Sequence, residues 1–165
     1  MLYYAASLDR FGKSLADYPH LGVYEKHYGF SGKDLGLYAL RGHELAGAAW
    51  IRLLGENDAP EAFVDDATPV LMMAVKPQFR GQGIGSMMLE QLLCEAGAIY
   101  NAISVSAVCD SPAFALCERQ GFVKLEGSET KSFLDGTGIC TMFKQLSKTP
   151  LKRPSDGYDP RRWMD

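Results

Sequence analysis

The sequence predicts one α/β domain, because two strand–helix units follow one another in the middle of the chain. Val70–Val75 is an uninterrupted apolar run, which is typical of a strand covered on both faces. Apolar residues then recur at helical spacing from Gly83 until Gly97, where we expect the helix to end. In the second unit, apolar residues alternate over Ala102–Val108, and a helix begins at Pro112 and ends near Gly121.

Local chemistry specifies the ends of these elements. Lys76-Pro77 ends the first strand, since proline has no N–H for a ladder. Ser111 is a good N-cap, Pro112 suits the first helical position, and Gly121 suits a left-handed C-terminal residue. The remaining predicted strands are Met1–Ala6, Leu35–Arg41, Glu44–Leu54, Phe122–Glu126 and Ile139–Leu146. The remaining predicted helices run from a Ser7 cap to Tyr18, before Pro19, and over Val23–Tyr28.

Composition excludes several classes of protein. The chain has 165 residues, 47% of them hydrophobic, which suits one globular domain. A formal net charge of −3 offers no broad basic surface, so we expect no nucleic-acid partner. No apolar run approaches a membrane span, and the first residues lack a signal-peptide pattern. Four cysteines without CxxC spacing indicate reduced thiols and a cytoplasmic protein, and three scattered histidines do not indicate a metal site.

The connection between the first strand and its helix is rich in glycine. Gly81, Gly83 and Gly85 alternate, which lets backbone N–H groups converge without side chains in the way. The unpaired N–H groups of the helix's first turn carry partial positive charge, so this arrangement favours a phosphate or pyrophosphate. The spacing is neither Gly-x-Gly-x-x-Gly nor that of a P-loop, which excludes both of those nucleotide motifs.

What does match is Arg-x-x-Gly-x-Gly, as Arg80, Gly83 and Gly85, directly after an apolar strand ending in Val-x-Pro. Here the chain resembles the GNAT superfamily of acetyl-CoA-dependent N-acyltransferases, over about Leu35 to Leu146. The resemblance implies a mixed, mostly antiparallel sheet with helices on both faces. It also implies that the fourth and fifth strands splay to form a coenzyme A cleft, with acetyl-CoA as co-substrate.

The resemblance also assigns cofactor contacts. In the family, the glycine loop wraps the pyrophosphate of coenzyme A, and the splayed strand pairs its backbone with the pantetheine arm and the acyl carbonyl. The residues that match are Met73, Ala74, Val75, Arg80, Gly81, Gln82, Gly83, Ile84, Gly85 and Ser86. As a charge partner for phosphate, Arg80 is expected to strengthen coenzyme A binding.

A second family pattern, Asn-x-x-Ala-x-x-x-Tyr-x-x-x-Gly-Phe, is kept only in part. Ala113, Gly121 and Phe122 are present, but the Asn position holds Asp110 and the Tyr position holds Cys117. In many relatives that tyrosine protonates the departing thiolate, so this role cannot simply be carried over. Asp110 and Cys117 are the catalytic candidates. Cys117 is either a substitute acid or a small buried hydrophobe, and we favour the second interpretation.

The acceptor is less well defined. The resemblance makes Tyr24, His27 and Tyr28 candidate acceptor contacts, although surface aromatics packing a helix pair are an alternative. Some relatives place a glutamate base where this chain has Val105. The base therefore stays open between Asp110, Asp65 and Tyr28.

These observations predict a single acyltransferase domain over residues 1–146 and a C-terminal extension over 147–165. The expected activity is transfer of an acetyl or short acyl group from acetyl-CoA to an amine of unknown identity. The alternative is a non-catalytic acyl-CoA-binding module, because the family's tyrosine and glutamate are both missing. We expect a monomer or homodimer that binds neither membrane nor nucleic acid.

Overall fold

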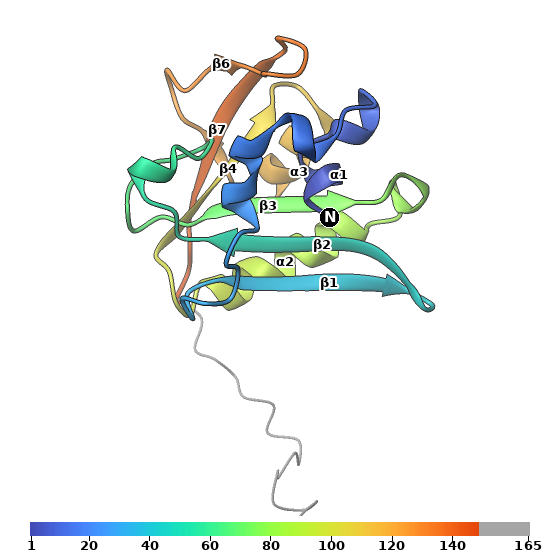
Figure 1. Cartoon of the computed structure of the whole chain (residues 1–165). Coiled ribbons are helices and arrows are strands. Elements are labelled where there is room, and N and C mark those ends of the chain that lie inside the picture. Colours follow the sequence, from blue (N-terminus) through green and yellow to red (C-terminus); the bar gives the residue numbers. More distant parts are fainter. Residues whose placement is uncertain (149–165) are drawn as a thin grey trace, which may run out of the picture.

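The computed structural model describes residues 1–148, which form a seven-stranded sheet flanked by helical segments (Figure 1). The strand order is β1-β2-β3-β4-β7-β5, and β6 pairs with β7 beside this path. All pairings are antiparallel except the parallel pairing of β3 with β4, so the predicted mixed, mostly antiparallel sheet is confirmed. The strands are β1 (Leu35–Arg41), β2 (Glu44–Arg52), β3 (Val70–Val75), β4 (Ala102–Val108), β5 (Val123–Lys124), β6 (Thr130–Lys131) and β7 (Gly138–Gln145).

Helices cover both faces of the sheet, as expected. The helices α2 (Ile84–Ala96) and α3 (Pro112–Arg119) bury apolar residues in the larger core. On the other face, α1 (Leu2–Ala5) and a series of short 3₁₀ helices enclose a second core (Figure 1). Side chains of β3 alternate between the two cores, with Leu71 in the first and Val70 in the second.

The signals in the middle of the chain predict its elements well. β1, β3 and β4 have the predicted bounds, and β2 ends two residues before the predicted end. The Ser111 hydroxyl accepts a hydrogen bond from the Phe114 amide at 3.1 Å, as expected for an N-cap. Gly121 follows α3 with φ of +85°, a conformation that glycine adopts without steric cost.

The predicted strand Met1–Ala6 is wrong, because this segment closes its hydrogen bonds locally as α1. The Ala5 amide donates to the Met1 carbonyl at 3.0 Å, and Leu2 is buried in the second core. The short apolar run therefore reflects packing on one face of the sheet. Periodicity cannot distinguish this from a strand over so few residues.

The predicted helices Ser7–Tyr18 and Val23–Tyr28 are also wrong. Ser7 has φ of +59° and Gly12 has φ of +60°, and each interrupts a right-handed helix. The segment forms three 3₁₀ helices instead, over Leu8–Arg10, Leu15–Asp17 and Pro19–Tyr24. The second of them is capped by Ser14, whose hydroxyl accepts from the Ala16 amide.

The C-terminal region departs from the prediction in detail. The predicted strand Phe122–Glu126 is shortened to β5, and β6 forms between the two predicted strands Phe122–Glu126 and Ile139–Leu146. β7 begins one residue early, at Gly138. Most of the predicted extension 147–165 lies outside the described residues.

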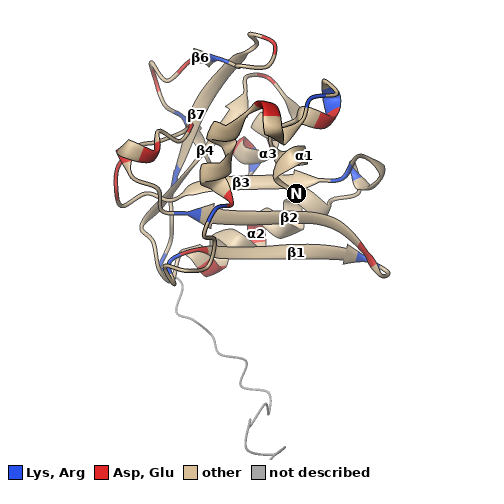
Figure 2. Cartoon of the chain, in the orientation of Figure 1, with Lys and Arg blue, Asp and Glu red and all other residues tan. Residues whose placement is uncertain are grey.

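Charged residues occur mainly at strand ends and in the connecting loops, where both signs are interspersed (Figure 2). The strand bodies carry few charges, which matches the burial of β2, β3, β4 and β7. None of the helices in residues 1–148 is long and apolar enough to cross a membrane.

One buried ion pair fixes the N-terminal segment to the sheet. Arg52 Nε lies 3.2 Å from Asp34 Oδ1, and the two side chains are 10% and 3% exposed. The Arg52 Nη1 also donates to the carbonyls of Val23 and Lys26, at 2.8 and 2.7 Å. The Asp34 Oδ2 accepts from the Gly29 amide at 2.8 Å. A single arginine thus satisfies backbone groups of a segment that has little regular structure.

Replacing Arg52 with alanine should lower the free energy of unfolding by about 3–5 kcal/mol, because Asp34 would remain buried without its partner. Urea titration of the purified variant measures this change. The matched control is Lys124→Ala, which removes an exposed ion pair with Glu129 and should cost less than about 1 kcal/mol. Equal losses in the two variants would contradict the role given to Arg52.

Candidate functional site

The parallel pairing between β3 and β4 is short, and the two strands separate beyond it. Only Val70 with Ser104 and Leu71 with Val105 are in register. The β3 strand continues to Val75 and β4 to Val108, so their carboxyl ends diverge (Figure 1). The expected splay between these strands is therefore present.

Hydrogen bonding to β2 decides which backbone groups of β3 face this opening. The Lys76 amide donates to the Ala46 carbonyl at 2.8 Å, and Ala74 is the partner of Ala48 in the antiparallel register. Because bonded pairs recur at every second residue, the even-numbered residues of β3 point their N–H and C=O groups toward β2. The N–H and C=O groups of Met73 and Val75 consequently point the other way, toward the opening.

The N-terminus of α2 lies against the same residues. Gly83 is its N-cap, with φ of +79° and no side-chain cap, and the Met87 amide is bonded to the Gly83 carbonyl. The amides of the first turn precede that bond and have no partner within the helix. A Cβ added at Gly85 would lie 3.7 Å from Val75 Cγ2 and 3.9 Å from Met73 Cε, so the helix start packs directly on β3.

This arrangement fits the pantetheine and pyrophosphate groups of coenzyme A. A Cβ added at Gly81 or Gly83 would meet no atom within 4 Å, so the loop's outer surface is open. Uncapped helix amides favour a phosphate there. The backbone groups of Met73 and Val75 favour an extended, amide-containing chain, as an open strand edge does.

Arg80 is held by two groups of the protein. Its Nε donates to the Val75 carbonyl at 2.9 Å, and its Nη2 donates to Asp9 Oδ2 at 3.1 Å. The guanidinium therefore lies at the edge of the opening, beside the loop that the sequence assigns to the cofactor. Whether it also contacts phosphate stays a prediction.

The two catalytic candidates lie in different environments. Cys117 is 3% exposed in the larger core, and burial raises the pKa of its thiol from 9.0 to about 11. Such burial agrees with the interpretation of Cys117 as a small hydrophobe. Asp110 is exposed at the end of β4, with φ of +59°, directly before the cap of α3.

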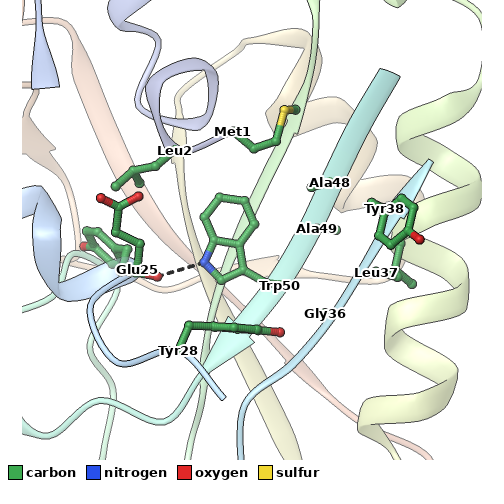
Figure 3. A pocket seen from close by; sticks show the side chains of 11 residues that line it. Met1, Leu2, Glu25, Tyr28, Gly36, Leu37, Tyr38, Ala48, Ala49 and Trp50 are labelled. Carbon is green, nitrogen blue, oxygen red and sulfur yellow. Dashed lines mark hydrogen bonds between the residues drawn. The ribbon is translucent and has the colours of Figure 1, made fainter. Parts of the chain in front are cut away.

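A cavity of about 380 Å³ lies on the opposite face of the sheet, over β1 and β2 (Figure 3). The Trp50 ring stands at its centre, with Tyr28 on one side and Met1 on the other. The lining residues are Met1, Leu2, Tyr24, Glu25, Tyr28, Gly36, Leu37, Tyr38, Ala48, Ala49 and Trp50. Ala48 pairs directly with Ala74 of β3, so the cavity lies one strand away from the splay.

Tyr24 and Tyr28, predicted as acceptor contacts, both line this cavity. The Tyr24 hydroxyl accepts a hydrogen bond from the Glu61 amide at 2.7 Å, and burial raises its pKa to about 12. The Tyr24 backbone carbonyl accepts from Trp50 Nε1 at 3.0 Å, which fixes the orientation of the indole ring. Tyr28 is 39% exposed, and the Arg52 guanidinium lies 5.9 Å from its ring centroid.

The open candidates for the base differ in their surroundings. Burial, followed by the charge of Asp34, raises the pKa of Tyr28, which leaves its hydroxyl protonated at neutral pH. Hydrogen bonds, chiefly from the Ala67 amide, lower the pKa of Asp65 and make it a weaker base. Neither residue gains the pKa near neutrality that suits a general base.

The structure thus brings the cofactor candidates together at one end of β3 and the tyrosines together on the other face. Sequence reasoning missed Asp9 and Trp50. The alternation in β2 could have placed Trp50 on the face opposite Ala49. Asp9 gives no such signal, since its partner Arg80 is 71 positions away.

Comparisons with known proteins agree with this geometry. A family model described as an acetyltransferase (GNAT) domain matches residues 33–124, more than half of the chain. A comparison with curated proteins gives no match.

Many solved structures are similar in fold, including the following three. A ribosomal-protein-alanine N-acetyltransferase from Brucella melitensis is 23% identical, with a TM-score of 0.58, over 71% of this chain and 72% of that one. A phosphinothricin acetyltransferase from Sinorhizobium meliloti, in complex with acetyl-CoA, is 20% identical, with a TM-score of 0.58, over 77% of this chain and 69% of that one. An acetyltransferase of the GNAT family from Streptococcus pneumoniae is 18% identical, with a TM-score of 0.62, over 77% of this chain and 75% of that one.

The splayed strands, the uncapped helix at their carboxyl end and the family match lead to one conclusion. The chain belongs to the GNAT acetyltransferase family.

Proposed function

We propose that the protein transfers an acetyl group from acetyl-CoA to a primary amine. The observation that carries this proposal is the coincidence of two features at the end of β3. The backbone groups of Met73 and Val75 face an open splay, and the uncapped N-terminus of α2 packs beside them. Together they offer sites for an extended thioester arm and for its pyrophosphate.

The reaction requires little from the protein beyond alignment of the thioester with the amine. A thioester supplies an electrophilic carbonyl and a fair leaving group, since thiol pKa values lie near ~8.5. Residues of this chain hold the two reactants in line and stabilise charge on the carbonyl oxygen through backbone N–H groups. The N–H groups of Met73 and Val75 are the donors that we assign to this task.

The acceptor is proposed to approach from the face that carries the aromatic cavity. Trp50, Tyr24 and Tyr28 give it apolar walls, and Glu25 adds a carboxylate at its rim. Aromatic faces and a carboxylate favour an organic cation with an apolar body. The Ala48–Ala74 pair joins the floor of this cavity to β3, which supports an acceptor amine directed toward the splay.

The neutral amine attacks the thioester carbonyl, and the C–N bond forms as the C–S bond breaks. The proton lost by the nitrogen passes through water to the departing thiolate, so no proton transfer is assigned to Cys117. The buried thiol has a pKa of about 11, so it is protonated at neutral pH but also packed away from solvent. A group enclosed in the core cannot exchange its proton readily after each turnover. This assignment agrees with the absence of the family's tyrosine at this position.

A panel of primary amines, with release of free coenzyme A as the readout, tests the activity. Gly83→Val should abolish both acetyl-CoA binding by calorimetry and coenzyme A release, because a Cβ at Gly83 meets no protein atom within 4 Å and would enter the open space that we assign to the pyrophosphate. The matched control is Gly127→Val, which also replaces a glycine with positive φ and open surroundings, in a distant loop. It should incur similar backbone strain yet keep its affinity for acetyl-CoA.

Two outcomes would contradict parts of this proposal. Unchanged acetyl-CoA affinity in a folded Gly83→Val variant would remove the loop from the cofactor site. Tight acetyl-CoA binding by the wild type, with no coenzyme A release across the amine panel, would indicate a non-catalytic acyl-CoA-binding module.

Cys117 also predicts a pH dependence of stability. Its thiol pKa is raised from 9.0 to about 11 in the folded state, so its contribution is full below pH 9 and is lost as the pH rises toward 11. Between pH 9 and pH 11, the free energy of unfolding should fall by about 2 kcal/mol less in Cys117→Ala than in the wild type. Urea unfolding at pH 8, 9, 10 and 11 measures both curves. Parallel curves would show that this thiol is not buried as described.

The same substitution tests catalysis. Cys117→Ala should keep turnover at saturating acetyl-CoA within a few fold of the wild type, because we assign no proton transfer to the thiol. A loss of about 10²-fold with binding intact would instead identify Cys117 as the general acid.

A further inference from the structure

Two of the four cysteines lie close together where β4 ends beside β7 (Figure 1). Ala107 of β4 is the register partner of Cys140 on β7, and the Cys109 amide donates to the Gly138 carbonyl at 3.0 Å. Residues two apart on a strand point to the same face, so Cys109 and Cys140 are diagonal neighbours on one face of the sheet. Cys140 belongs to the larger core, and Cys109 packs against it.

The two thiols contact each other directly. The residue opposite Cys109 is glycine, and a Cβ added at Gly138 would lie 3.9 Å from Cys109 Sγ, so no facing side chain fills the space beside this sulfur. The Cys140 thiol donates to the Ala107 carbonyl at 3.7 Å and also shares a side-chain hydrogen bond with the Cys109 thiol. The pair is therefore already in place for a reaction between the sulfurs.

The two thiols differ in their access to solvent. Cys109 is partly exposed, whereas Cys140 is 1% exposed. Burial, followed by the hydrogen bond with Cys109, raises the pKa of Cys140, so this thiol stays protonated at neutral pH and is a poor first nucleophile. A dissolved oxidant consequently meets Cys109 first, and Cys140 meets only what forms on its neighbour.

We propose that Cys109 and Cys140 form a site of reversible oxidation by a hydroperoxide, with Cys109 as the attacking thiol and Cys140 as the resolving thiol. The Cys109 sulfur attacks hydrogen peroxide, an S–O bond forms as the O–O bond breaks, and water leaves. The Cys140 sulfur then attacks the resulting sulfenic acid, the S–S bond forms, and a second water leaves. The two thiols lose two hydrogen atoms in total, and the peroxide is reduced to two waters.

The disulfide would change the backbone next to α3. Diagonal neighbours on a sheet lie farther apart than disulfide-bonded residues, so the bond forms only when Cys109 moves toward β7. Two residues later Ser111 caps α3, and a Cβ added at Gly85 of α2 would lie 3.5 Å from Leu116 Cδ2 of that helix. Oxidation therefore moves α3 relative to the first turn of α2, and this coupling to the cofactor loop rests on the proposed function. A strained disulfide is also readily reduced, which makes the change reversible.

The competing explanation is that both cysteines only fill space in the core, as buried cysteines commonly do. Thiol chemistry separates the two explanations. The folded protein is treated with a small excess of hydrogen peroxide, the peroxide is removed with catalase, and the remaining thiols are alkylated after unfolding. The wild type should lose two of its four free thiols and yield a linked Cys109–Cys140 peptide that dithiothreitol separates.

Two variants test the assigned roles. Cys140→Ala leaves a small apolar group in the core and removes the resolving thiol, so the sulfenic acid on Cys109 should persist and be trapped by dimedone. Cys94→Ser is the matched control, because it removes an exposed thiol of α2 and should leave the Cys109–Cys140 link unchanged. No linked peptide from the wild type, or no dimedone adduct on Cys109 in folded Cys140→Ala, would overturn the inference.

Calorimetry with acetyl-CoA tests the coupling to the cofactor loop. The linked wild type should bind acetyl-CoA about tenfold or more weakly than the reduced protein, the scale of one or two lost hydrogen bonds, and dithiothreitol should restore the affinity. Cys109→Ser, treated with peroxide in the same way, controls for oxidised methionines and should stay within about threefold of its untreated affinity. Unchanged affinity in the fully linked wild type would overturn the coupling. Failure of the proposed function shows separately, as no acetyl-CoA binding by the reduced protein, and the peptide analysis does not depend on it.

Discussion

The end of the β3–β4 pairing is the constraint on which the site depends. After Leu71 and Val105 the two strands have no common register, while β3 stays bonded to β2 as far as Lys76. Met73 and Val75 consequently keep a fixed backbone without a strand to pair with on one side. The pairing of β3 with β2 matters as much as its separation from β4. Without β2, the unpaired N–H and C=O groups of Met73 and Val75 would not be held in place.

The two cores give β3 two covered faces, one for each of the two proposed ligands. Leu71 and Met73 pack toward α2, whose N-terminus provides amides for phosphate, and Val70 and Met72 pack toward the N-terminal segment. The proposed cofactor and acceptor sites therefore lie on opposite faces of the sheet and meet at the splay. Two ion pairs hold the acceptor side: Arg52 with Asp34 fixes the cavity wall, and Arg80 with Asp9 fixes the edge of the opening.

Local chemistry made the middle of the chain predictable. Continuous apolar character indicated β3, and a serine cap with a closing glycine indicated α3, since both signals act within a few residues. The first 30 residues were not predictable in the same way. The last of their 3₁₀ helices is held by Arg52, which reaches the carbonyls of Val23 and Lys26, 29 and 26 positions away, and no local pattern records such a contact. The glycine loop is a local pattern and therefore indicated a cofactor site. The contact of Asp9 with Arg80 joins residues 71 positions apart, so only the structure revealed it.

Amide hydrogen exchange along β3 tests the central claim most directly. Without ligand, the amides of Met72 and Ala74 should exchange slowly because they are bonded to β2, and those of Met73 and Val75 should exchange faster. Saturating acetyl-CoA should slow exchange at Met73 and Val75 by about tenfold or more and leave Met72 and Ala74 nearly unchanged. Unchanged exchange at Met73 and Val75 in the presence of bound acetyl-CoA would contradict the account.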